Sequence, residues 1–182
     1  MPAATNQMKA RDPGIVILGL FMDIGASIAF VHQPPEADLM RRRPRDPRAR
    51  LLDRSMIVGI LTGGLTLALL TGGAFLLGLR LYGVDAGRTL ALVAWLVGGA
   101  SLGLVMAWER RQLSVRALLR NPALPIWFTV AIAFAAAIVA SPMLASVLHG
   151  SVVPLEAAAV VGVAALLFPF WLELLKSGSR QD

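Results

Sequence analysis

Residues 55–79 read SMIVGILTGGLTLALLTGGAFLLGL, an apolar stretch that contains no charged side chain. A helix needs about 20 mostly apolar residues to cross the hydrocarbon layer of a bilayer, which is roughly 30 Å thick. The glycines within the stretch do not argue against a helix, because glycine is tolerated where helices pack against one another in lipid. Residues 55–79 therefore predict a membrane-spanning helix.

The composition of the whole chain agrees with this interpretation. The 182 residues are 57% hydrophobic and 15% charged, whereas soluble domains average about 45–50% apolar and about 25% charged residues. Such a chain is too apolar to be disordered or to form a soluble enzyme domain. It has no cysteine and only two histidines, which lie far apart. We therefore expect no disulfide, no metal site and no cofactor.

Four further blocks are similar to residues 55–79 in length and apolar content. Together they predict an all-α, polytopic membrane bundle of five transmembrane helices, at about 14–32, 55–79, 89–107, 124–148 and 155–175. The five spans make one domain over residues 14–176, between an N-terminal tail at 1–13 and a C-terminal tail at 177–182. Trp95, Trp108, Trp127 and Trp171 mostly fall near the ends of spans, where tryptophan is typical of the membrane–water interface.

The distribution of basic residues predicts the orientation of the bundle. Lys and Arg are enriched in cytoplasmic loops, and most of the 17 basic residues lie in 33–54, between the third and fourth spans, or after the fifth. We therefore expect a multi-pass protein of the cell (plasma) membrane with a cytoplasmic C-terminus and an extracytoplasmic N-terminal tail. The lipid bilayer is the expected partner of the arginines. Nucleic acid is not, because no aromatic residues are interleaved with them.

The segment at 33–54, QPPEADLMRRRPRDPRARLLDR, is more than a polar connection. Its four prolines each push the preceding residue out of the helical region, so we expect a stiff crossing. With the aspartate of the preceding span, this segment resembles P-type cation-transporting ATPases, whose sixth membrane helix carries an aspartate and runs into a loop rich in proline and arginine. The residues that carry this resemblance are Asp23, Pro34, Pro35, Glu36, Asp38, Met40, Arg43, Pro44 and Arg45.

The later part of the chain resembles the same family. Arg120-Asn121-Pro122 before Ile126-Trp127 is similar to the loop before the ninth helix, and Trp171, Glu173 and Lys176 are similar to the end of the tenth. The five spans would then correspond to helices six to ten of such a pump. Within the family, the chain most resembles the proton-pump branch. The resemblance implies that Pro44, Arg45 and Asp46 form a loop that couples the membrane helices to a phosphorylation domain.

Asp23 is the candidate cation- or proton-binding residue. An acid at mid-membrane costs about 2.5–3.5 kcal/mol on insertion scales and usually has a function. The alternative is a protonated or paired aspartate that only fixes helix packing. Calcium pumps have an asparagine and a threonine where this chain has Gly19 and Met22. Since calcium needs six to eight oxygen ligands, a single carboxylate favours a proton or one small cation.

The resemblance also shows what these residues lack. P-type pumps form a phosphoaspartate in an Asp-Lys-Thr-Gly-Thr motif, and neither this motif nor a phosphate-binding Gly-rich loop occurs here. We therefore expect no enzyme activity from the chain by itself. The first hypothesis is a non-catalytic membrane module that contributes to cation or proton translocation with a separate or lost ATPase half, its partner a P-type ATPase catalytic chain. The alternatives are a membrane scaffolding or interaction protein derived from a pump fragment and, less favoured, an autonomous cation conduit.

Overall fold

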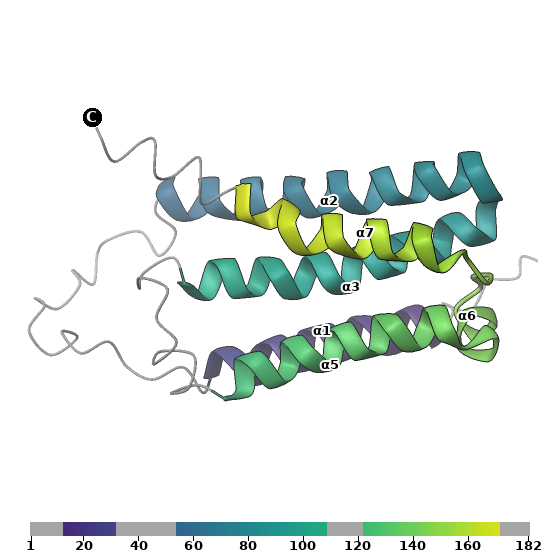
Figure 1. The fold of residues 1–182 in the computed structure, drawn as a ribbon. Coiled ribbons are helices and arrows are strands. Elements are labelled where there is room, and N and C mark those ends of the chain that lie inside the picture. Colours follow the sequence, from purple (N-terminus) through teal and green to yellow (C-terminus); the bar gives the residue numbers. More distant parts are fainter. Residues whose placement is uncertain (1–12, 32–53, 109–121, 172–182) are drawn as a thin grey trace, which may run out of the picture.

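The computed structural model describes residues 13–31, 54–108 and 122–171, and the regular structure within these residues is entirely helical. The helices lie side by side in an elongated bundle (Figure 1). They are α1 (Pro13–Val31), α2 (Arg54–Tyr82), α3 (Val84–Trp108), α5 (Ala123–Ala140), α6 (Pro142–Val147), α7 (Leu155–Leu167) and the 3-10 turn η2 (Phe168–Phe170). The expectation of an all-α bundle is therefore confirmed for the described residues.

Length and composition support three of the five expected spans. In the part of the chain that the structure describes, α2, α3 and α5 are long and apolar enough to cross a membrane. The fifth expected span is a shorter apolar helix over Leu155–Phe170, whose last turn tightens into η2 around Pro169. α1 has 19 residues and carries Asp23, but it is not one of the three.

The expected span at 124–148 is wrong in its continuity. α5 ends at Ala140, and Ser141 is extended, with φ −113° and ψ 108°. The cause is Pro142, which disfavours the helical region for the residue before it. The Ser141 side chain then accepts a hydrogen bond from the Leu144 amide and so begins α6. In contrast, α2 and α3 extend beyond their expected bounds, because Gly83 alone joins them in a left-handed conformation with φ 97°.

α3 forms the centre of the bundle and contacts α1, α2, α5 and α7. It can do so because small residues along its length let neighbouring helices approach closely. Gly98 lies against the Leu70 side chain of α2, and Gly99 lies against Met22 of α1. Leu90, Leu96 and other α3 side chains are fully buried as a result.

The ends of the helices fall into two groups (Figure 1). The last residues of α1 and α3 and the first residues of α2 and α5 lie at one end of the bundle, which we call the Val31 end. The turn between α2 and α3 lies at the opposite end, which we call the Gly83 end. The four helix ends that adjoin the basic segments 32–53 and 109–121 are thus on the same side of the bundle.

Candidate functional site

Asp23 lies on α1, a helix that packs against the bundle along one face only. On this face Met22 is 8% exposed and approaches Gly99 of α3. One turn further on, Gly25 lies directly beneath the indole ring of Trp127 from α5. Because Gly25 has no side chain, the indole can lie against the α1 backbone, and this contact fixes the rotation of α1 about its axis.

The rotation turns Asp23 away from the other described helices. Its side chain is exposed, and so are those of Leu20, three positions before it, and Ser27, four positions after it. This spacing places them on one face of the helix. We call this surface the Asp23 face, and it consists of Leu20, Asp23, Ile24, Ser27, Ile28 and Val31. Among the residues that the structure describes, none forms an ion pair or hydrogen bond with Asp23.

The Asp23 face offers two oxygen-bearing side chains to a ligand or partner. Asp23 and Ser27 are four residues apart and therefore adjacent on the helix surface. The described residues contain no cluster of three or more His, Asp or Glu side chains that could hold a metal. A cation at Asp23 would consequently need further ligands from outside these helices. The alternative of an aspartate that fixes packing between the described helices has no support here, since Asp23 points away from them.

Pro44, Arg45 and Asp46, the expected coupling residues, lie outside the described residues, as do Glu173 and Lys176. Their roles stay predictions. The structure adds only that the helix ends on either side of the coupling segment, Val31 and Arg54, are both at the Val31 end of the bundle (Figure 1).

Trp127 was not recognised from the sequence as a core residue. It was expected at the membrane interface, but its side chain is only 7% exposed. Gly25 and Gly103 leave room for the ring on the two neighbouring helices, and its Nε1 has no hydrogen-bond partner among the described residues. The signal was the presence of glycines in two spans, yet nothing in the sequence indicates which side chain fills the space that they leave.

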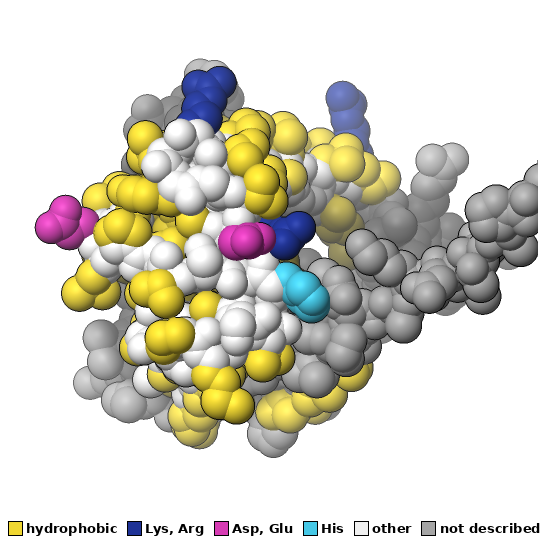
Figure 2. Space-filling view, turned by 90° about the vertical axis from the view of Figure 1, so that its right-hand side faces the viewer, with side chains coloured by type: hydrophobic (Ala, Val, Ile, Leu, Met, Phe, Trp, Pro, Cys, Tyr) yellow, Lys and Arg dark blue, Asp and Glu magenta, His cyan; other side chains and the backbone are white. Residues whose placement is uncertain are grey.

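A second polar cluster lies at the Gly83 end, which faces the viewer in Figure 2. Arg88 Nη1 pairs with Asp85 Oδ1 at 2.9 Å and donates to the carbonyl of His149 at 3.2 Å. The Thr89 hydroxyl, which is fully buried, donates to the Ser151 carbonyl at 2.8 Å and accepts from the Ser151 amide at 3.0 Å. These bonds hold the connection between α6 and α7 against the first turns of α3. The role of this cluster is therefore structural.

A family model described as cation transporting ATPase, C-terminus, matches residues 14–177. The matched region begins in the first turn of α1 and includes Asp23 and all the helices that follow. Comparison with curated proteins and with solved structures found no match.

Proposed function

The chain belongs to the family of cation-transporting ATPase C-terminal regions, and we propose that it is the non-catalytic membrane module of such a pump. In this proposal Asp23 contributes to the translocation of a cation or proton. The chemical steps on ATP belong to catalytic domains outside these 182 residues. All five apolar segments cross the plasma membrane, including α1, whose 19 residues span about 28 Å as a helix.

The observation that carries the proposal is the exposure of Asp23 on a helix face that is apolar apart from Asp23 and Ser27. A carboxylate that faces lipid is costly, by about 2.5–3.5 kcal/mol at the bilayer centre. The described helices do not relieve this cost, because none of them covers the Asp23 face. A protein surface that covers α1 and brings a hydrogen-bond donor or a bound cation to Asp23 would relieve it. The remaining membrane helices of a pump are a surface of this kind.

The ligands on the Asp23 face favour a proton or one small cation, as in the proton-pump branch. One carboxylate and the Ser27 hydroxyl fall well short of the six to eight oxygens that calcium requires. A carboxylate that faces a protein interface can instead gain and lose a proton, or hold a single cation with help from the partner surface.

The grouping of helix ends supports a cytoplasmic Val31 end. Basic segments favour the cytoplasmic side, and the helix ends that adjoin both of them lie at the Val31 end (Figure 1). Pro44, Arg45 and Asp46 would then face the catalytic domains directly after α1. A force on this loop would reach Asp23 through the last two turns of α1.

Cross-linking from the Asp23 face tests the proposal. The chain has no cysteine, so a single Ser27→Cys substitution carries a photoactivatable cross-linker at one position only. In native membranes we expect it to capture a polypeptide that contains a domain labelled by radioactive phosphate from ATP. The matched control is Val130→Cys, which is exposed on α5 and should not capture that domain. Capture of lipid alone from position 27 would contradict the proposal and favour the scaffolding alternative.

A further inference from the structure

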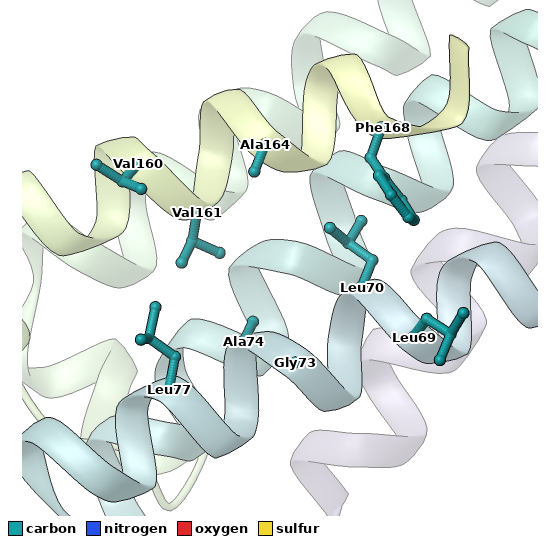
Figure 3. Close-up of a pocket in the computed structure, with 9 residues that line it drawn as sticks. All are labelled: Leu69, Leu70, Gly73, Ala74, Leu77, Val160, Val161, Ala164 and Phe168. Atoms are coloured by element: carbon teal, nitrogen blue, oxygen red, sulfur yellow. The ribbon is translucent and has the colours of Figure 1, made fainter. Parts of the chain in front are cut away.

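An open apolar groove of about 280 Å³ runs between α2 and α7 (Figure 3). Gly73, Ala74 and Leu77 line it from α2, and Val161 and Ala164 line it from α7, with Phe168 of η2 beside them. The flanking leucines are largely exposed, with Leu69 at 60% and Leu77 at 43%. The groove therefore opens to the surroundings of the bundle and is not an enclosed cavity.

The groove exists because α2 and α7 do not pack closely against each other. α7 makes its close contacts with α3, and α2 closely approaches this part of the chain only at η2. The space between them is left by small residues. A β-carbon placed on Gly73 would meet no atom within 4 Å, so this position of α2 borders open space.

Only a hydrocarbon occupant suits the chemistry of this groove. Its lining side chains are aliphatic or aromatic (Figure 3), and water gains little in a space without polar partners. A transmembrane helix has a diameter of about 10–12 Å, so it could reach only the rim with its side chains. An extended acyl chain is narrow enough to lie along the floor between the two helices.

A charged side chain marks one end of the groove. Arg80 follows Leu77 by three residues and Gly73 by seven, so it lies on the same face of α2 at the Gly83 end. Arg80 is exposed and forms no ion pair within the described part of the chain. It is two residues from the end of the apolar span Met56–Tyr82, at the depth of lipid headgroups. A guanidinium group at this depth can bind a phosphate through two parallel hydrogen bonds.

We propose that the groove binds one phospholipid, with an acyl chain between α2 and α7 and the headgroup phosphate on Arg80. The site would be specific for the combination of a hydrocarbon chain and a phosphate at the Gly83 end. It is separate from the Asp23 face, which lies on α1, and it does not depend on the transport function.

Photolabelling of the purified full chain tests this proposal. The probe is phosphatidylethanolamine with a diazirine in the middle of one acyl chain, diluted into phosphatidylcholine vesicles. We expect labelled peptides from both α2 and α7. Gly73→Leu places a side chain in the groove and should reduce this labelling about tenfold, equivalent to about 1.4 kcal/mol. Gly64→Leu is the matched control, because it also adds a leucine to open space on α2 but outside the groove.

A second variant separates the phosphate from the acyl chain. Arg80→Gln should reduce labelling by the phospholipid probe about tenfold and leave labelling by a diacylglycerol with the same diazirine chain unchanged. Helix content and elution volume should be the same for all variants. Equal labelling of Gly73→Leu and the wild type would overturn the proposal. Loss of a co-purified membrane protein from Gly73→Leu, with lipid labelling intact, would also overturn it and assign the groove to a protein helix.

Discussion

At the scale of single residues, the contact between Gly25 and Trp127 sets the orientation of α1 and therefore of Asp23. A β-carbon at Gly25 would overlap the indole ring, which is held in the core between α1 and α3. We expect Gly25→Ala to destabilise the protein by about 1–3 kcal/mol, the usual effect of overpacking. Thermal unfolding in detergent, followed by tryptophan fluorescence, measures this. Gly19→Ala, on the same helix but with open space around it, should unfold no earlier than the wild type.

Thr89 is the residue through which α3 holds the connection between α6 and α7. Thr89→Val keeps the shape of the side chain but leaves the backbone groups of Ser151 without their partner. Unsatisfied buried polar groups cost about 1–3 kcal/mol each, so we expect a clearly lower unfolding temperature. Thr129→Val is the control, since its exposed hydroxyl bonds only to the carbonyl of Pro125 in its own helix. The role given to Thr89 is wrong if the two variants unfold at the same temperature.

At the scale of elements, α2 and α3 form the closest helix pair of the bundle near their shared turn. A β-carbon on Gly78 would lie 2.6 Å from the Cα of Gly87, so the two backbones approach as closely as glycine allows. Gly78→Ala should therefore push the helices apart and increase hydrogen–deuterium exchange of amides beside the Gly83 turn. Gly72→Ala, which adds a methyl to open space on α2, should leave exchange there unchanged. Similar exchange in both variants would contradict the close contact.

The sequence predicted which segments are helical better than it predicted where each helix ends. Uncharged runs predicted helices at α2 and α3, although the single-residue turn at Gly83 made both longer. The sequence indicated that Pro142 lies near a segment end or a bend, but not that the helix ends before it, because a membrane helix can also accommodate a proline within its length. The pairing of Thr89 with Ser151 joins residues far apart in sequence, and no local pattern indicates it.

The sequence indicated Asp23 as the candidate residue, but not the direction in which its side chain faces. Asp23 stands out in an apolar segment, and this alone marks it as a candidate. Which way it faces could not be read from the sequence, because a membrane helix is apolar both where it meets lipid and where it meets protein. Directional patterns of polar and apolar residues, which orient helices in soluble proteins, are therefore absent from α1.

At the scale of the whole molecule, the bundle predicts that its two ends face opposite sides of the membrane. Because the chain contains no cysteine, single cysteines can report this directly. Met143→Cys, at a position that is 77% exposed on α6, should react with a membrane-impermeant maleimide added to intact cells. Pro122→Cys, at the start of α5, should react only after the cells are permeabilised. The reverse pattern would contradict a cytoplasmic Val31 end.

The whole bundle also has one face that is incomplete by itself. α3 is largely covered by the other described helices and α2 can meet lipid along most of its length, but α1 presents a carboxylate outward. In the function proposed above, these helices are part of a larger membrane assembly whose remaining helices cover α1. Asp23 takes part in transport within this assembly.

ATP-driven cation or proton uptake into vesicles tests whether Asp23 takes part in transport. The vesicles contain the assembly, which is purified by an affinity tag on this chain. Asp23→Asn keeps the size of the side chain but removes its charge, and Asp23→Glu restores a carboxylate. We expect the asparagine variant to assemble normally but to lose uptake by about tenfold or more, equivalent to at least about 1.4 kcal/mol, while the glutamate variant retains part of it. Uptake at the wild-type rate by Asp23→Asn would contradict a role for Asp23 in transport.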